Sequence, residues 1–424
     1  MNQYTIDGQT LTSIELKCLL VSRGVQVDSA VYRRLGREYR LSVNPLTCNC
    51  LLLPDGTIVQ MTDTRFHLRY LSGILSWENL KLLRYVSELG TPFKIVLQND
   101  KAALFHKHEF VDNVTFPSYT DFFKQHTAAG TPFIGNAVLQ GLDWVAFQCL
   151  WSCEYAAAGK PCQYCFSGAE FQALAEKGKP QPGALSPEDA AEIAAYAFEN
   201  TGANSIQITG GSTFSGDAEA EHIRAYLHAL QTHIRPERIR ELLLYITPPA
   251  DCARTDEYFA LGASRIACSL EVWDPELAKE ITPGKIAFTT RARHLEILTR
   301  IAEHQGAGKA FSNFIIGLEP FESLAEGARY LAKRGIIPTA SVWMPMGRPV
   351  RGSMKAPELD YYRRVIDLYA ELYVKYNLKP PGQRGLHVCV DRDIWENYCP
   401  PADETADHSE SDCRETATAF TINT

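Results

Sequence analysis

The sequence predicts an α/β protein, a partial (β/α)6 TIM-like barrel with an N-terminal α+β accessory domain. From about residue 136, short apolar or β-branched segments alternate with amphipathic segments six times in succession. Such repetition indicates parallel strands joined by helical crossovers. No reversal of this order is visible, which favours a barrel or partial barrel over an open sheet. Before residue 136 the helix-like and strand-like patterns do not alternate regularly.

Residues 1–135 are expected to form the accessory domain. The run "LTSIELKCLLVSRG" has helical periodicity between a Thr/Ser start and a Gly stop. The run "CNCLLLPDGTIVQMTDT" predicts a hairpin around Pro54-Asp55-Gly56. A second amphipathic helix is expected from Ser76 to Gly90. No catalytic constellation is visible in this part, which indicates an accessory role.

Residues 136–399 are expected to form the barrel and a C-terminal extension, followed by a polar, poorly ordered tail over 400–424. The predicted strands are "DWVAFQCL" (143–150), "NSIQIT" (204–209), "ELLLYIT" (241–247), "SRIACSLEV" (264–272), "AFSNFIIGL" (310–318) and "IPTASVWM" (337–344). The predicted helices that follow them cover 186–200, 217–233, 253–261, 289–304, 322–334 and 357–376.

Charge and hydropathy exclude several classes of protein. The net charge of −8 argues against a nucleic-acid-binding surface, because phosphate neutralisation needs clustered Lys and Arg. No apolar run reaches the roughly 18–20 residues that a membrane helix needs. The start, "MNQYTIDGQTLTS", lacks the layout of a signal peptide, so a cytoplasmic location is expected. A disulfide framework among the 12 cysteines is then not expected.

Four cysteines stand close together directly after the first barrel strand. Cys149, Cys153, Cys162 and Cys165 read C-x3-C-x8-C-x2-C. The loops at the C-terminal ends of barrel strands are where active sites of such folds gather. Zinc would take all four thiolates as a closed tetrahedral site, whereas an iron–sulfur cluster would take three or four. Spacing alone leaves both alternatives open.

The second half of this motif, Cys162 and Cys165 with Tyr164 between them, resembles the radical S-adenosylmethionine (SAM) superfamily, of the biotin-synthase-like barrel type. The usual motif there is C-x3-C-x-aromatic-C, so the C-x8-C-x2-C spacing is atypical. The resemblance implies a [4Fe–4S] cluster bound by Cys153, Cys162 and Cys165, with Cys149 as the alternative first ligand. It places Tyr164 near the cluster and the SAM adenine.

Further segments resemble the family's SAM-binding motifs in order along the chain. The stretch "ITGGST" resembles the GGE-like motif that holds the SAM amino group, with Ser212 in place of the acid, and "FIIGLE" resembles the GxIxGxxE motif in part. Arg291 is an expected clamp for the SAM carboxylate, with Arg293 beside it. The resemblance implies that SAM is bound by Gly210, Gly211, Ser212, Thr213, Ser269, Glu271, Arg291, Glu319 and Val342.

The activity implied by this resemblance is reductive cleavage of SAM to a 5′-deoxyadenosyl radical that abstracts hydrogen from a substrate in the barrel. The expected substrate is a small amino-acid-like or cofactor-precursor molecule, and a peptide is the alternative. A flavodoxin or ferredoxin is the expected reductant. Arg348 and Arg351, after the sixth strand, suggest that the substrate carries a carboxylate or phosphate.

Two other functions and one other site stay open. A zinc-stabilised α/β barrel that binds a partner is one alternative, and a SAM-dependent methyl or aminocarboxypropyl transferase is the other. The segment "HVCVDRDIWENYC" could form a second metal site from His387, Cys389, Asp391 and Cys399. A returning strand packed on the barrel is the preferred interpretation of that segment.

Overall fold

The structure is a computed structural model. It describes residues 1–31, 33–34, 50–60, 90–117, 120–133, 136–140, 143–147, 153–165, 178, 185–344, 355–382 and 388–399. The predicted helix from Ser76, the tail over 400–424, Cys48, Cys149, Arg348, Arg351 and His387 lie outside these residues.

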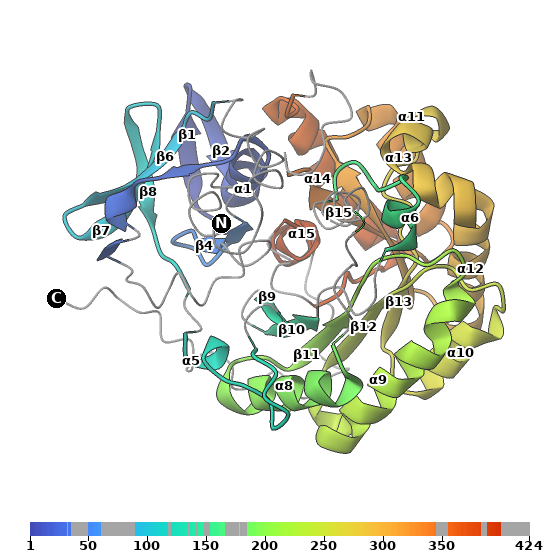
Figure 1. Ribbon diagram of the computed structural model, residues 1–424. Helices are drawn as coiled ribbons and strands as arrows, with labels where there is room; N and C mark the ends of the chain where they lie inside the picture. The colour runs from blue at the N-terminus through green and yellow to red at the C-terminus, as the bar shows by residue number, and fades with distance from the viewer. Residues whose placement is uncertain are drawn as a thin grey trace.

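A curled sheet of seven strands forms the centre of the larger part of the molecule (Figure 1). Its order is β15-β14-β13-β12-β11-β10-β9, and neighbours from β10 to β15 are parallel, while β9 is antiparallel to β10. The strands are β9 (Val138–Gln140), β10 (Trp144–Phe147), β11 (Ser205–Ile208), β12 (Glu241–Tyr245), β13 (Arg265–Ala267), β14 (Ala310–Ile316) and β15 (Ile337–Val342). Six parallel strands in sequential order confirm the predicted partial barrel.

Helical crossovers cover the outer face of this sheet (Figure 1). The long ones are α8 (Pro187–Asn200), α9 (Ala220–His233), α10 (Ala253–Ala260), α12 (Arg291–Gln305), α13 (Phe321–Ala332) and α14 (Leu359–Tyr376), each within a few residues of its predicted range. Shorter elements are α6 (Glu154–Ala157), α11 (Pro275–Ile281), the 3₁₀ helices Gly216–Glu219 and Pro236–Arg238, and a π-helical turn, Lys285–Thr289. The sequence analysis did not anticipate α11 or the π-helical turn.

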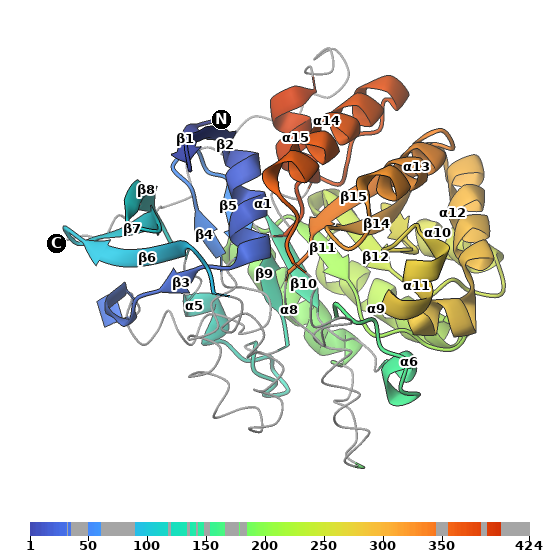
Figure 2. The ribbon, with the colours of Figure 1, turned by 90° about the horizontal axis from the view of Figure 1, so that it is seen from above.

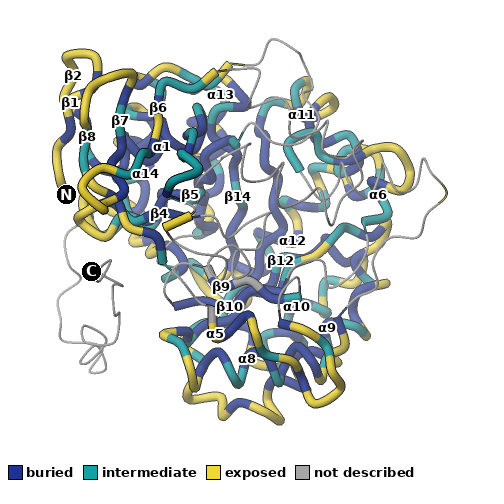
Figure 3. Tube along the Cα trace, turned by 60° about the vertical axis from the view of Figure 1, so that its left-hand side comes forward, coloured by how far each residue is buried: buried dark blue, intermediate teal, exposed yellow. Residues whose placement is uncertain are grey.

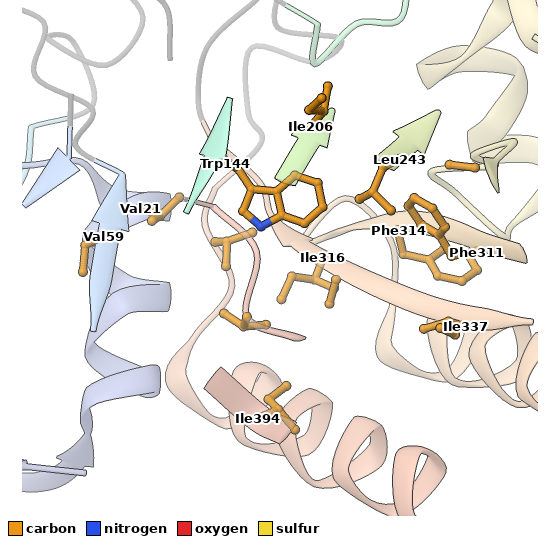
Figure 4. Close-up of a cluster of buried hydrophobic side chains, with 14 of the residues drawn as sticks. Val21, Val59, Trp144, Ile206, Leu243, Phe311, Phe314, Ile316, Ile337 and Ile394 are labelled. Atoms are coloured by element: carbon orange, nitrogen blue, oxygen red, sulfur yellow. The ribbon is translucent and has the colours of Figure 1, made fainter. Parts of the chain in front are cut away.

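The strands are buried on both faces, which explains their near-continuous apolar sequences. Every residue of β10, β11 and β15 is buried. Figure 3 shows buried tube along the strands and exposed tube along the outer sides of helices such as α8. Apolar side chains of β11, β12 and β14, among them Ile206, Leu243 and Phe311, belong to one buried cluster (Figure 4).

The N-terminal part is α+β, as predicted. It contains the hairpin β1 (Gln3–Ile6) and β2 (Gln9–Thr12), helix α1 (Ser13–Arg23), the predicted antiparallel pair β4 (Cys50–Leu52) and β5 (Ile58–Gln60), and α5 (Thr120–Phe123). A second sheet, in the order β3-β6-β7-β8, consists of β3 (Gln26–Val27), β6 (Phe93–Gln98), β7 (Lys101–His106) and β8 (Glu109–Val114). A reciprocal capping box between Thr12 and Glu15 begins α1.

The C-terminal segment returns to the barrel as a short strand-like stretch. The Val342 amide donates to the Val388 carbonyl (2.9 Å), and the Val390 amide donates to the Ala340 carbonyl (3.0 Å). Helix α15 (Asp391–Tyr398) follows directly. The preferred interpretation of this segment, a returning strand on the barrel, is therefore confirmed.

Helix α1 packs against the same edge of the barrel, beside β15 and α14 (Figure 2). Lys17 of α1 is fully buried, and its ammonium lies 2.7 Å from the carboxylate of Asp393 in α15. Arg363 of α14 donates to Glu15 at 2.8 Å. The apolar core continues from α1 into the barrel, because Val21 and Trp144 belong to one cluster (Figure 4).

No helix among the described residues is both long enough and apolar enough to cross a membrane.

The buried ion pair between α1 and α15 generates a prediction. Asp393→Asn leaves the Lys17 ammonium buried without an opposite charge, so the free energy of unfolding should fall by about 3 kcal/mol. Urea unfolding measures this change. Lys107→Met is the matched control, because the Lys107–Asp7 pair (2.5 Å) is more than half exposed on both sides and should contribute below about 1 kcal/mol. An equal loss in both variants would contradict the prediction.

Candidate active site at the carboxyl edge of the parallel sheet

The cysteine loop follows β10 at the edge where the parallel strands end. Cys153 precedes the first residue of α6, a single helical turn that contains Ala156 and Ala157. Gly159, with φ of 73°, lies in the left-handed region just after α6, a conformation that favours glycine at the end of a helix. The amide of Cys165 donates to the Cys162 carbonyl (3.0 Å), which forms a tight turn between these two cysteines.

The Gly-Gly stretch after β11 lies directly against the first cysteine of this loop. A Cβ on Gly211 would stand 2.5 Å from both the backbone nitrogen and the Cα of Cys153, so the close approach requires glycine. The Glu154 amide donates to the Ser212 carbonyl at 2.8 Å. In return, the Glu154 carboxylate accepts from the Phe214 amide. The two loops are thereby held together by one backbone hydrogen bond and by the Glu154 side chain.

The other side of the cysteine loop contacts the segment after β13. The Gln163 amide donates to the Ile281 carbonyl (2.8 Å). A Cβ on Gly284 would stand 2.6 Å from the Tyr155 side chain and 2.7 Å from the Lys160 carbonyl oxygen. The loop is thus fixed between the loops after β11 and β13.

The thiols of this loop influence one another. Cys153, Cys162 and Cys165 are all half-buried. Burial raises the pKa of the Cys162 thiol to about 11, Lys285 opposes this rise, and Glu271 and Cys153 add to it. Tyr164 hydrogen-bonds to the Cys162 side chain, and burial holds the pKa of its phenol well above its usual value. Its ring packs with an apolar cluster that includes Val272, Ile281, Ile315, Leu318 and Trp343.

This donor set fits an iron–sulfur cluster. Three thiols stand on one short loop, and in a [4Fe–4S] cluster each thiolate binds a separate iron. Within the residues that the structure describes, no three His, Cys, Asp or Glu side chains surround a point that one metal ion could occupy.

A buried carboxylate, Glu219, connects the loops after β11 and β12. It accepts from the Thr213 hydroxyl (2.9 Å), the Thr213 amide (3.3 Å) and the Thr247 amide (3.2 Å). Burial raises its pKa to about 7, while these hydrogen bonds oppose the rise. Ser212 stands where the GGE-like motif has its acid, and Glu219, seven residues later, was not among the predicted site residues. No local motif singles it out.

A row of polar side chains runs from the segment after β13 across β14 to β15. Glu271 is paired with Lys285 (3.3 Å) and accepts from the Asn313 side-chain amide (3.0 Å). The Asn313 oxygen accepts from the Ser341 hydroxyl (2.9 Å), which also contacts the Cys389 thiol (3.1 Å). Because the Ser341 proton is used toward Asn313, Cys389 is the donor in this last contact. The sequence analysis selected Glu271 and missed Lys285 and Asn313.

Ser269, the other predicted residue of the segment after β13, contacts members of this row. The Ser269 hydroxyl accepts from the backbone amide of Asn313 (3.3 Å), and the Ser269 carbonyl accepts from the Lys285 ammonium. Asp391, once a candidate for a second metal site, accepts instead from the Ala340 amide (2.6 Å) and the Tyr373 hydroxyl (2.8 Å).

Two predicted SAM ligands make contacts within the protein. The Glu319 carboxylate accepts from the backbone amides of Trp273 (2.9 and 3.1 Å) and Asp274 (3.0 Å). The Arg291 guanidinium lies 3.7 Å from the centre of the Trp273 ring and donates to the Trp273 carbonyl. Arg293 donates to the Pro249 carbonyl at 2.8 Å. Their contact with SAM stays a prediction, as it does for Gly210 and Val342.

Comparison with known proteins shows similarity to one superfamily. Residues 158–347 match the model of the Radical SAM superfamily, a range that includes Cys162 and Cys165 and begins after Cys153. The chain is 26% identical over 257 residues to the bacteriochlorophyllide c C-7(1)-hydroxylase of Chlorobaculum limnaeum. This match covers 58% of the chain and 64% of the relative, so the chain spans less than two thirds of that protein's length.

Solved structures give weaker similarities. Streptococcus suis SuiB has a TM-score of 0.40 and 15% identity, over 56% of this chain and 48% of that one. Coproporphyrinogen III oxidase (HemN) from Escherichia coli, described as a radical SAM enzyme, has a TM-score of 0.35 and 14% identity, over 55% of this chain and 53% of that one.

The carboxyl of Glu219 generates a prediction about pH. Its pKa is about 7 in the folded protein against an ordinary 4.5. Between these values the folded state binds more protons than the unfolded state, so the free energy of unfolding falls as pH rises from about 4.5 to about 7. Glu219→Gln cannot titrate and should gain roughly 3 kcal/mol relative to the unaltered protein between pH 4.5 and 7.5. Urea unfolding across this range checks it.

The control for this pH series is Glu221→Gln, which changes an exposed carboxylate two residues along the chain. It should keep the pH dependence of the unaltered protein. If Glu219→Gln also keeps the pH dependence of the unaltered protein, Glu219 does not have the raised pKa on which the prediction depends.

The contact of Gly211 with Cys153 generates a second prediction. Gly211→Ala forces the Cys153 backbone to move, because no Cβ is accommodated at 2.5 Å. After anaerobic reconstitution, this variant should lose most of its bound iron and sulfide. Ser212→Ala is the control, since the bond to the Glu154 amide uses the Ser212 carbonyl. Full iron content in Gly211→Ala would show that the position of Cys153 is not critical.

Proposed function

Since residues 158–347 of this chain match the model of the Radical SAM superfamily, we propose that the chain is an enzyme that cleaves SAM reductively and abstracts a hydrogen atom from a small substrate. Enzymes of this superfamily use a [4Fe–4S] cluster and SAM. The observation that carries the proposal is the loop with Cys153, Cys162 and Cys165, which is fixed at the carboxyl edge of the parallel sheet.

In this proposal Cys153, Cys162 and Cys165 hold the cluster. When bound, the cluster supplies the electron that splits the sulfonium of SAM, which yields methionine and the 5′-deoxyadenosyl radical. The tight turn between Cys162 and Cys165 supports this assignment, because it presents two thiols from one short segment. The contact of Gly211 with Cys153 supports it as well, since it positions the thiol that the atypical spacing separates from the other two.

The surrounding residues bind SAM and exclude water. The loop Gly210–Thr213 offers backbone groups next to Cys153, and Ser269 and Glu271 offer oxygens near the ends of the central strands. Tyr164 and the apolar cluster around it limit access of solvent to the thiols. Glu319 and Arg291 support this site indirectly, because both hold the backbone at Trp273. Val342 contributes as the last residue of β15.

For the substrate, we propose a small cofactor-precursor or amino-acid-like molecule, with a peptide as the alternative. The name of the Chlorobaculum limnaeum relative, a hydroxylase of bacteriochlorophyllide c, favours the cofactor-precursor class. The polar row with Asn313 and Ser341 offers hydrogen-bonding groups in the barrel interior for such a molecule. A flavodoxin or ferredoxin in the cytoplasm is the proposed source of electrons.

The test is anaerobic reconstitution of the full chain with iron and sulfide, followed by reduction in the presence of SAM. The protein should bind a [4Fe–4S] cluster and release 5′-deoxyadenosine. Cys162→Ala and Cys165→Ala should each abolish SAM cleavage and most cluster binding, because each thiolate binds one iron. Cys252→Ala is the matched control, since this half-buried thiol lies outside the loop.

The other outcomes identify the alternatives. A colourless protein with one tightly bound zinc would indicate a zinc-stabilised barrel. Consumption of SAM without 5′-deoxyadenosine would indicate a methyl or aminocarboxypropyl transferase. Cys153→Ala should eliminate 5′-deoxyadenosine, while Cys149→Ala should retain the cluster, and the reverse result would make Cys149 the ligand.

A further inference from the structure

An ion pair between Lys285 and Glu271 occupies an unusual piece of backbone next to the cysteine loop. The two side chains are 14% and 12% exposed, and the ammonium lies 3.3 Å from the carboxylate. Glu271 has a φ of 71°, which is rare for a residue with a side chain, and Lys285 opens the π-helical turn. Such backbone features are costly and gather at functional sites.

Contacts within the protein hold both charges in place. Lys285 also donates to the Ser269 carbonyl, and Glu271 also accepts from the Asn313 amide at 3.0 Å. The Asn313 oxygen accepts from the hydroxyls of Ser341 (2.9 Å) and Thr339 (3.3 Å), which fixes the direction of its amide. The pair is therefore an ordered part of the site rather than a mobile surface contact.

The backbone before Lys285 lies against the cysteine loop. A Cβ on Gly284 would stand 2.7 Å from the Lys160 carbonyl oxygen. Ile286 and Tyr164 pack with the same small apolar cluster. The charges of Lys285 and Glu271 both act on the Cys162 thiol, with opposite sign.

We propose that the Lys285–Glu271 ion pair sets the reduction potential of the cluster bound at Cys162, with Lys285 raising it and Glu271 lowering it. This inference rests on the proposed function. Reduction of a cluster by one electron from a flavodoxin or ferredoxin adds one negative charge to it. A fixed cation nearby stabilises the reduced form and a fixed anion destabilises it, most strongly where water is excluded. The pair thus acts through its fixed charges and does not coordinate the iron of the cluster.

The experiment is a redox titration of the reconstituted full chain, followed by electron paramagnetic resonance, without SAM or substrate. Lys285→Met should shift the midpoint potential of the cluster downward, and Glu271→Gln should shift it upward. The double variant should lie between the two single variants. Lys285→Arg, which keeps the charge, should restore the potential toward that of the unaltered protein.

The matched control is Lys279→Met on neighbouring α11. Lys279 pairs with Glu276 at 2.6 Å, but the two side chains are 58% and 77% exposed, so the potential should not move. If both Lys285→Met and Glu271→Gln bind the cluster but shift its midpoint potential in the same direction, or leave it unchanged, the inference is overturned. If Lys285→Met fails to fold, Glu271→Gln decides by itself, because any result other than an upward shift overturns the inference. Failure of the unaltered protein to bind a cluster would overturn the proposed function first.

Discussion

Carboxylates that accept backbone amides of neighbouring loops hold the carboxyl edge of this sheet together. Glu154 binds the Phe214 amide, Glu219 binds the Thr247 amide, and Glu319 binds two amides after β13. Each link joins loops from adjacent strands, and two of these carboxylates are almost completely buried. Loops are ordinarily the most variable parts of a barrel. Here charge-assisted hydrogen bonds give them a fixed mutual position, on which the geometry of the cysteine loop depends.

The larger fold could be predicted because its physical signals are local. Parallel strands buried on both faces have continuous apolar sequences, and capped amphipathic segments between them have a distinct period. Strand β13 was expected over 264–272 but ends at Ala267, and α11 follows it where only a loop was expected. Its start has a readable signal, since Asp274 caps it and Pro275 opens it. The turn between β6 and β7 also has a sequence signal, the pair Asn99-Asp100. Both residues adopt positive φ, which Asn and Asp tolerate in tight hairpin turns.

The site could be predicted only in part. The thiols and the Gly-Gly motif can be found in short stretches of sequence, whereas the contact of Gly211 with Cys153 appears only in the structure. Lys285 and Asn313 were missed because they lie 14 and 42 residues from Glu271, and no local pattern connects them. Arg291 and Glu319 were identified by their positions after strands. Position does not reveal that Arg291 packs on the Trp273 ring and that Glu319 accepts from the Trp273 amide. A residue's partner is a property of the tertiary structure, which spacing along the chain does not encode.

The pairing of Lys17 with Asp393 also constrains the order in which the chain can acquire its structure during synthesis. The two residues are 376 positions apart. On the ribosome, α1 emerges early with its apolar face and a lysine that needs a counter-charge, whereas α15 is made only after the barrel. The N-terminal helix therefore reaches its final environment late, as expected for contacts of long sequence separation. Until then its apolar residues, including Leu16, Leu20 and Val21, lack part of the core that buries them in the folded protein.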